Sequence, residues 1–322
     1  MDKKELRIVF MGTPDFAVES LRRLVEGGYN VVGVITMPDK PMGRHGSVLQ
    51  ASAVKQYAMA QGLTVLQPER LKEEHFLEKL RALKPDLQIV VAFRMLPEVV
   101  WSMPPLGTFN LHASLLPQYR GAAPINWAVI NGDTETGVTT FFLKHEIDTG
   151  EVIGQRRVPI ADTDNAGVVH DRLMHVGGEL VIHTVDAILA GTVKPVPQEE
   201  MEQGELRPAP KIFKDTCRIP WDKGVKASYD FIRGMAPHPG AWTELRAPAA
   251  TPVVLKIFEA KKRPGSPVEQ PGTVVTDGKT YLSVSLKDGY VDLAELQLAG
   301  KKRMRVEDFL RGYHVAAGTT LG

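Results

Sequence analysis

The chain has 322 residues, of which 43% are hydrophobic and 24% are charged, and its formal net charge is +1. This composition is typical of an ordinary soluble globular protein, and the length predicts two domains because one hydrophobic core seldom serves so many residues. The single cysteine, Cys217, excludes intrachain disulfides and cysteine-based metal clusters, and it fits a reducing compartment.

The N-terminal residues Met1 to Glu5 lead directly into an apolar strand, so no signal peptide is expected. No apolar run approaches the length of a transmembrane helix. We therefore expect a soluble cytoplasmic protein without a membrane partner.

The first elements follow the order of a βαβ unit. Residues 7–11 form an apolar strand, residues 14–26 a helix with Thr13 as the expected N-cap, and residues 30–36 a second strand. This order predicts a parallel sheet with right-handed crossovers. The turn at Gly12 lacks the three spaced glycines of the dinucleotide fingerprint, so NAD and FAD are not predicted.

A polar segment of residues 37–47 interrupts this pattern. It is rich in proline and glycine and carries Lys40, Arg44 and His45, so we expect a long exposed loop. Loops of this length often have a function, but these residues also fit an exposed segment without a role.

The α/β pattern then resumes. Periodicity predicts helices at residues 51–61, 73–83, 96–101, 125–130 and 166–189, and strands at residues 87–92, 107–112, 138–143 and 151–158. Residues 1–190 are therefore expected to form a domain built on a parallel sheet.

The stretch from Phe109 to Gly150 contains the residue types of a reaction site. On an extended strand, Asn110 and His112 point to the same face. An amide, an imidazole and the later carboxylate of Asp148, beside a glycine-rich turn, can stabilise a developing oxyanion and move a proton. Without further information these residues also fit a strand end in which the Asn and the His make ordinary hydrogen bonds.

The remainder of the chain no longer alternates strands and helices. Residues 191–211 are polar and rich in proline, which is typical of a linker. In residues 212–322 the pattern predicts one helix at 225–235 and short strands at 241–246, 253–260, 273–276, 280–286 and 290–298. Asp277-Gly278 and Asp288-Gly289 predict two-residue hairpin turns, so we expect a small antiparallel barrel.

Positive charge is concentrated in this second domain. Residues 212–322 contain 17 Lys and Arg against 12 Asp and Glu, whereas residues 1–211 contain 22 against 26. Two basic triplets, Lys261 to Arg263 and Lys301 to Arg303, are expected in its loops. Chance unevenness gives the same counts, but the pattern favours a polyanionic partner such as nucleic acid.

Several runs of this sequence match a known family. They include Phe10 to Phe16, Pro38 to Pro41 with Gly43-Arg44, Asn110 to Pro117, Tyr119 to Ile125, Ile147 to Gly150, Trp221, Pro237 to Trp242 and Ala299 to Lys302. The Asn-x-His, Ser-Leu-Leu-Pro and Asp-Thr-Gly set marks the folate-dependent formyltransferases. The basic loop, the appended barrel and the Gly-Lys-Lys run narrow the match, so the chain resembles the methionyl-tRNA formyltransferase family along nearly its whole length.

This resemblance implies a Rossmann-like formyltransferase domain (residues 1–190), a linker (191–211) and an OB-like β-barrel that binds tRNA (212–322). The implied reaction transfers the formyl group of 10-formyl-tetrahydrofolate to the α-amino group of methionine on initiator methionyl-tRNA. The implied catalytic residues are Asn110, His112 and Asp148, and the implied tetrahydrofolate-binding residues are Ser114, Leu115, Leu116 and Pro117. The implied tRNA-binding residues are Arg44, in a loop of about residues 38–49, and Lys301 and Lys302.

The chemistry agrees with these residue types. The attacking amine needs no enzyme nucleophile, so we expect a tetrahedral intermediate, no covalent enzyme intermediate and no metal. Asn110 and His112 can donate hydrogen bonds to the oxyanion, while Asp148 can orient His112 and accept a proton from the amine through water. We expect the enzyme to act as a monomer.

Two segments depart from the family pattern. The loop continues after Arg44 as His45-Gly46-Ser47, where further basic residues are usual, and the segment around Phe93 and Arg94 replaces an Ala-Tyr-Gly pattern and is one residue shorter. The alternatives are a formyltransferase for an amino sugar nucleotide or glycinamide ribonucleotide and, more distantly, a non-catalytic RNA-binding protein.

Overall fold

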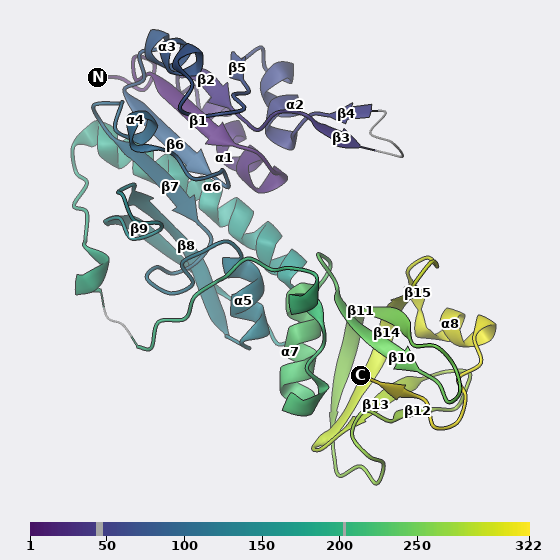
Figure 1. Cartoon of the computed structure of the whole chain (residues 1–322). Coiled ribbons are helices and arrows are strands. Elements are labelled where there is room, and N and C mark those ends of the chain that lie inside the picture. Colours follow the sequence, from purple (N-terminus) through teal and green to yellow (C-terminus); the bar gives the residue numbers. More distant parts are fainter. Residues whose placement is uncertain (43–47, 202–203) are drawn as a thin grey trace. The chain divides into compact units, whose positions relative to one another are not determined.

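The computed structural model describes residues 1–42, 48–201 and 204–322 (Figure 1). The chain divides into two compact units, each assembled from separate segments. The sheet unit comprises residues 1–121, 136–158 and 170–208, and the barrel unit comprises residues 122–135, 159–169 and 209–322. Each unit has a β-sheet as its centre.

The sheet unit is built on seven strands in the order β5-β2-β1-β6-β7-β8-β9. Their bounds are β1 (Ile8–Gly12), β2 (Val31–Ile35), β5 (Val65–Leu66), β6 (Leu87–Val91), β7 (Thr108–His112), β8 (Glu135–Phe142) and β9 (Val152–Pro159). The expected parallel pairing is confirmed from β5 to β7. Strand β8 runs antiparallel to β7, so the sheet is mixed.

Helices cover this sheet. They are α1 (Asp15–Glu26), α2 (Ala53–Ala60), α3 (Glu74–Ala82), α4 (Glu98–Trp101) and α6 (Ala166–Ala190). Apolar side chains of α3, such as Leu80, share a core with Val9 and Met11 of β1. These contacts follow from the alternation of side chains along a strand, which gives every second residue of β1 to the same face.

Helix α6 is the one helix among the described residues that is long and apolar enough to cross a membrane by length and composition alone. Its contacts are those of a core helix. A Cβ at Gly177 would meet the side chain of Leu111 in β7, and the Thr184 hydroxyl lies 2.8 Å from the Thr140 hydroxyl of β8. The helix therefore packs directly on the sheet.

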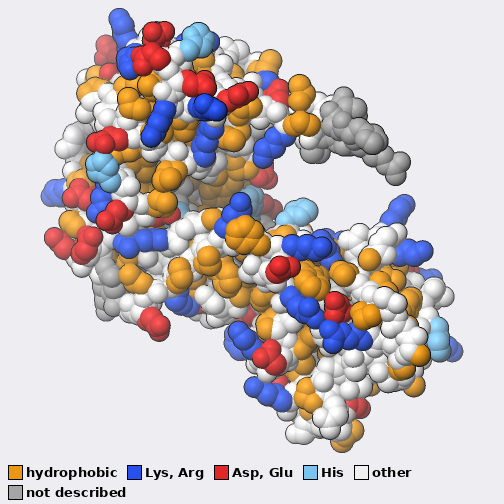
Figure 2. Space-filling model, in the orientation of Figure 1, with side chains coloured by type: hydrophobic (Ala, Val, Ile, Leu, Met, Phe, Trp, Pro, Cys, Tyr) orange, Lys and Arg blue, Asp and Glu red, His pale blue; other side chains and the backbone are white. Residues whose placement is uncertain are grey.

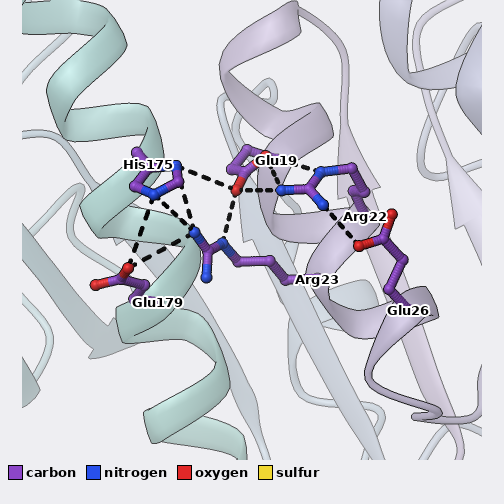
Figure 3. A network of polar contacts seen from close by, with 6 residues as sticks. All are labelled: Glu19, Arg22, Arg23, Glu26, His175 and Glu179. Atoms are coloured by element: carbon purple, nitrogen blue, oxygen red, sulfur yellow. Dashed lines mark hydrogen bonds and ion pairs between the residues drawn. The ribbon is translucent and has the colours of Figure 1, made fainter.

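Helices α1 and α6 are joined by a network of charged side chains (Figure 3). The Glu19 carboxylate, whose side chain is 12% exposed, lies 2.7 Å from both Arg22 and Arg23. Arg23 also approaches Glu179 of α6 at 3.6 Å, and His175 of α6 approaches Glu19 at 3.5 Å. Burial raises the pKa of Glu19, but the hydrogen bonds from the two arginines outweigh it and hold the pKa below its ordinary value.

The start of α1 differs from the sequence prediction. Pro14 is the N-cap and makes no side-chain cap, whereas the buried Thr13 hydroxyl has no hydrogen-bond partner among the described residues. The Oδ1 of Asp15 instead accepts a hydrogen bond from the Phe16 amide. The prediction of Thr13 as the N-cap is therefore wrong by one residue.

The polar segment after β2 is also more regular than expected. Strands β3 (Lys40–Met42) and β4 (Val48–Gln50) pair antiparallel, so the flanks of the expected loop form a two-stranded ribbon. Asp39 at its base is held by Lys55 and Gln67, both within 2.8 Å. Arg44 lies outside the described residues.

The barrel unit contains an antiparallel sheet in the order β12-β13-β14-β11-β10-β16, with β15 paired to β14. Its strands are β10 (Ala241–Arg246), β11 (Val253–Pro264), β12 (Val274–Thr276), β13 (Leu282–Leu286), β14 (Gly289–Leu298), β15 (Met304–Arg305) and β16 (Thr320–Leu321). A bridge between Thr273 and Thr320 joins the two edges of the sheet. The expected small barrel is therefore confirmed, and it is nearly closed.

Three helices accompany the barrel, namely α5 (Pro124–Ile130), α7 (Val225–Met235) and α8 (Val306–Gly312). Among the described residues, short 3-10 turns occupy Gln198–Glu200, Asp215–Cys217 and Trp221–Lys223. Ile232 and Met235 of α7 are buried in the barrel core. Helix α7 has the same bounds as the predicted helix.

Two details of the barrel correct the sequence analysis. Residues Lys261 to Arg263 continue strand β11 rather than forming a loop, and both Lys262 and Arg263 pair with carboxylates. The Asp277-Gly278 turn is a longer loop in which the Asp277 carboxylate accepts backbone hydrogen bonds. At the other break, Leu286 pairs with Gly289, so this hairpin does have a two-residue turn, but the turn is Lys287-Asp288, one residue before the predicted Asp288-Gly289.

Candidate active site

Strand β7 presents Asn110 and His112 where the parallel part of the sheet meets the antiparallel strand β8. Asn110 lies opposite Val90 of β6 and Phe141 of β8, and His112 lies opposite Thr139. His112 is buried, and Asn110 is partly exposed. Because the two residues are separated by one position of an extended strand, their side chains emerge on the same face.

The imidazole of His112 is fixed by a backbone group. Its Nε2 lies 2.9 Å from the carbonyl oxygen of Tyr119, and since a carbonyl can only accept, Nε2 carries the hydrogen in this contact. The other ring nitrogen, Nδ1, lies 3.9 Å from Oδ2 of Asp148. That distance is too long for a hydrogen bond, so Nδ1 faces the carboxylate without being bound to it.

Asp148 lies in the loop between β8 and β9. Its side chain is 11% exposed, and its Oδ2 accepts a hydrogen bond of 3.0 Å from the backbone N–H of Gly121. Its backbone is left-handed, with φ of 55°, a conformation that Asp tolerates better than most residues. Gly150 lies near the end of the loop. A glycine is required there because a Cβ would overlap the carbonyl oxygen of Phe142.

The amide of Asn110 has one buried end and one accessible end. Its Oδ1 is buried and has no hydrogen-bond partner in the described part of the chain. Because the side chain as a whole is partly exposed, the Nδ2 group is the end that a ligand can reach. The amide nitrogen is therefore available as a hydrogen-bond donor beside His112.

The run Ser114 to Pro117 follows directly on β7. The Ser114 hydroxyl donates to the carbonyl of Gln118 at 2.6 Å, and the Leu116 amide donates to the Thr139 hydroxyl at 3.1 Å. Ser114, Leu116 and Pro117 are buried, whereas Leu115 is partly exposed. Any contact of this run with a ligand would therefore involve Leu115 or backbone groups.

A cavity of about 670 Å³ opens beyond the carboxyl end of β6. Its lining includes Leu71, Lys72, Leu96 and Val99, together with Arg94. The Arg94 guanidinium donates to the carbonyls of Pro68 and Glu69, and burial lowers its pKa. In parallel sheets, ligands bind at the carboxyl ends of strands, so this cavity is in the expected place for one.

The structure places Lys301 and Lys302 in the turn between β14 and β15, where both are exposed. Neither makes an ion pair with a carboxylate of the described residues. Both side chains are thus displayed to solvent, as the basic run predicted. A group of three or more His, Cys, Asp or Glu that could hold a metal ion is absent from the described part of the chain.

Four residues that the sequence analysis did not assign take part in this geometry: Tyr119, Arg120, Gly121 and Gln198. The first three belong to the run Tyr119 to Ile125, which matches the family. Tyr119 and Gly121 act through backbone groups, and Arg120 bonds to Gln198, which is far away in sequence. Gln198 bonds to Arg120 and to the loop of Asp148, and it lies in the segment expected to be a linker. Only a three-dimensional structure relates it to the site.

Comparisons with known proteins show the family of the chain. Residues 6–185 match the formyl transferase family, and residues 211–314 match the formyl transferase C-terminal domain. The chain is similar to the methionyl-tRNA formyltransferase of Phocaeicola vulgatus, with 72% identity over 318 residues that cover 98% of each chain.

Two solved structures share the fold. A crystal structure of HypX from Aquifex aeolicus in complex with tetrahydrofolic acid matches 98% of this chain with a TM-score of 0.63 and 19% identity, and this chain spans 50% of the length of HypX. The N-formyltransferase from Helicobacter canadensis, in complex with folinic acid and dTDP-3-aminofucose, matches 91% of this chain and 99% of its own length, with a TM-score of 0.62 and 19% identity. At this level of identity the likeness shows the fold, whereas the full-length identity of 72% shows the family. The chain belongs to the methionyl-tRNA formyltransferases.

Proposed function

We propose that this protein transfers the formyl group of 10-formyl-tetrahydrofolate to the α-amino group of methionine on initiator methionyl-tRNA. The observation that carries the proposal is the set formed by the accessible amide of Asn110, the buried imidazole of His112 and the carboxylate of Asp148. These groups stand in a chain that is 72% identical to a methionyl-tRNA formyltransferase over its full length.

Asn110 and His112 act as donors to the oxygen of the formyl group. Attack by the amine turns this oxygen into an oxyanion, and preorganised donors lower the energy of that state. Because Nε2 of His112 donates to the Tyr119 carbonyl, Nδ1 is the ring nitrogen that faces the formyl oxygen, and it donates there in the imidazolium form, in which both ring nitrogens carry a hydrogen. The amide nitrogen of Asn110 is the second donor.

Asp148 acts on the proton that the amine must lose. Its Oδ2 faces Nδ1 of His112 at 3.9 Å, so a water beside the pair, rather than between them, can reach both atoms. The Gly121 amide holds this oxygen in place. The carboxylate accepts the amine proton through water, the bond between the formyl carbon and the folate nitrogen breaks, and that nitrogen takes up a proton as it leaves. Because the amine itself attacks the formyl carbon, no enzyme atom forms a covalent bond with the substrate.

The co-substrate site extends along the carboxyl ends of β6 and β7. The cavity offers apolar side chains to a flat heterocycle and Lys72 to an acidic tail, although Glu98 also lies in its lining. The run of Ser114, Leu115, Leu116 and Pro117 is not part of this lining, and it contacts the co-substrate through Leu115 or backbone groups. When bound, 10-formyl-tetrahydrofolate supplies the formyl carbon on a nitrogen that can leave. No metal is needed for this chemistry.

The tRNA is bound by basic residues outside the catalytic set, namely Arg44, Lys301 and Lys302. In this proposal, residues 1–190 carry the chemistry, residues 191–211 connect, and residues 212–322 hold the tRNA through the exposed Lys301 and Lys302. Arg44, outside the described residues, contacts the tRNA from the segment between β3 and β4. Because its substrate belongs to translation, the enzyme acts in the cytoplasm, and it does so as a monomer.

One assay tests this proposal. The protein is incubated with 10-formyl-tetrahydrofolate and, separately, methionyl initiator tRNA, an amino sugar nucleotide and glycinamide ribonucleotide. Formylation of the tRNA alone is expected. Formylation of either small amine instead would replace the proposed substrate, and binding of tRNA with no formylation of any amine would show a non-catalytic RNA-binding protein.

A further inference from the structure

Gln198 lies in the proline-rich segment that follows helix α6, at the start of the 3-10 turn Gln198–Glu200. Its side chain is completely buried, with an exposed fraction of 0%. Burial of an amide is costly unless all of its polar atoms have partners, so a buried Gln in such a segment must be held by specific contacts.

The contacts of Gln198 use both ends of its amide. The Nε2 group donates to the carbonyl oxygens of Asp148 and Gly150, each at 2.8 Å. The Oε1 atom accepts from Nε and Nη2 of Arg120, at 3.0 and 2.7 Å. Both N–H donors and both lone pairs are thus occupied, which fixes the amide in a single orientation.

These partners belong to the two loops that present the reacting groups. Arg120 stands between Tyr119, whose carbonyl accepts from His112, and Gly121, whose amide donates to the Asp148 carboxylate. Gln198 therefore joins the loop that holds His112 to the loop that carries Asp148. Its amide reaches these loops through the Arg120 side chain and the carbonyls of Asp148 and Gly150.

Both loops contain a residue in an uncommon backbone conformation. Tyr119 and Asp148 have φ values of 57° and 55°, in the left-handed region. Such conformations persist only where the surroundings enforce them. The carbonyl of Asp148 is one of the two that Gln198 binds, so the clamp acts directly on the strained residue.

The segment around Gln198 is itself anchored to the sheet unit. Val196 and Val152 exchange backbone hydrogen bonds of 2.8 and 2.9 Å, and the Tyr119 amide donates to the carbonyl of Arg207 at 2.7 Å. The backbone is therefore held both before and after Gln198, which fixes the position of its side chain. A flexible linker without these contacts would leave the side chain free to move.

We propose that Gln198 is a positioning residue, which sets the separation of His112 and Asp148 by clamping Arg120 and the Asp148–Gly150 loop. The inference rests on the proposed formyl transfer. It assigns to the connecting segment a role in the chemistry of the sheet unit, in addition to its role as a connection.

Two substitutions separate the parts of the clamp. Gln198→Glu keeps the shape of the side chain and the acceptor for Arg120 but removes the two N–H donors. Gln198→Met keeps the length of the side chain but removes both the acceptor and the donors. We expect kcat to fall about tenfold to a hundredfold in each, since small displacements of reacting groups have effects of this size. The KM values for both substrates should change less than about twofold, because neither variant removes a substrate contact.

The matched control is Leu80→Ala, which destabilises the same unit through its core and leaves both loops intact. It should lower the melting temperature while kcat of the folded enzyme is retained. Hydrogen exchange supplies the local measurement, because the Gly121 amide should exchange faster in both Gln198 variants and at an unchanged rate in the control. If the Gln198 variants lose only melting temperature, as the control does, Gln198 is structural and the inference is overturned. A wild-type protein that fails to formylate methionyl-tRNA would instead overturn the proposed function.

Discussion

His112 has its two ring nitrogens directed at two different oxygens, one from the backbone of Tyr119 and one from Asp148. The backbone contact sets a hydrogen on Nε2, so Nδ1 is the nitrogen that faces the Asp148 carboxylate. The ring is therefore held by a carbonyl that any residue at position 119 supplies, while the Asp148 carboxylate approaches its other nitrogen at 3.9 Å. This assignment makes separate predictions for the two side chains.

Replacement of His112 by Ala should lower kcat about a hundredfold to a thousandfold, because it removes one preorganised donor to the oxyanion. Folate and tRNA binding should be retained, since the ring is buried against Tyr119 and Asp148. Single-turnover formylation and equilibrium binding measure the two quantities separately. Turnover near the wild-type rate would contradict the assignment of His112.

Replacement of Asp148 by Asn should lower kcat by at least about a hundredfold while the melting temperature changes little. An Asn side chain can still accept the hydrogen bond from Gly121 and tolerates the left-handed backbone, but it does not take up a proton. Asp148→Ala is the comparison, and it should also lose stability because the Gly121 amide loses its partner. If the Asp148→Asn enzyme kept full activity, the carboxylate would have no part in proton transfer.

Only those parts of the candidate site that consist of side chains could be predicted from the sequence. Asn110, His112 and Asp148 are a polar set in a recognisable pattern, and the structure brings them together. The carbonyl of Tyr119 has no signal in the sequence, because every residue has a carbonyl. Gln198 is 50 positions from Asp148 and lies in a segment without periodicity, so no local rule connects the two.

At the scale of elements, α1 and α6 are held together by charge as well as by packing. Glu19 is the centre of the network, since both arginines of α1 and His175 of α6 approach it (Figure 3). Its lowered pKa means that the ionised form of Glu19 is more favoured in the folded state than in the unfolded chain. The network therefore contributes stability that depends on pH.

Replacement of Glu19 by Gln should destabilise the protein at pH 7 by about 1 kcal/mol, or a fall of about 2–4 °C in melting temperature. Because the folded pKa lies below its ordinary value of 4.5, the wild-type advantage is complete above that pH and is lost as the pH falls through the folded pKa. Melting curves of both proteins between about pH 7 and pH 3 measure the difference. A difference that stays constant over this range would contradict the role of the Glu19 charge.

Most elements followed from periodicity, and the exceptions have physical reasons. Helix α7 and strand β10 have the predicted bounds because their hydrophobic patterns are clear and end at glycine or proline. The triplet at Lys261 was expected in a loop because of its charge, but a strand of an antiparallel sheet with one solvated face accommodates charged residues. The direction of β8 could not be read from its sequence, since a buried strand has the same apolar composition in either direction.

At the scale of the whole molecule, residues 212–322 have more basic than acidic side chains, but several of the basic side chains are neutralised by ion pairs. Arg263, Arg303 and Arg305 pair with Asp292, Glu295 and Glu259. Figure 2 shows basic and acidic side chains interspersed over the barrel unit. Exposed lysines such as Lys301 and Lys302 are therefore the groups best able to bind phosphate.

Charge reversal at these positions, Lys301→Glu with Lys302→Glu, should raise the KM for tRNA and leave kcat at saturating tRNA unchanged. The slope of log KM against log salt should become shallower by about 0.7 to 0.9 for each phosphate contact that is lost. The matched control is Lys279→Glu with Lys287→Glu, two exposed lysines in other turns of the same barrel. Equal effects in the two double variants would show that total charge matters and the position of Lys301 and Lys302 does not.

The anchoring of residues 196–207 has a consequence for dividing the chain. Composition places the end of the first domain at residue 190, yet the segment beyond it contains Gln198 and pairs with Val152 and Tyr119. A fragment cut at residue 190 would lose these contacts and expose the strained loops to water. The shortest N-terminal fragment that retains these contacts therefore extends to about Pro208, where the last segment of the sheet unit ends.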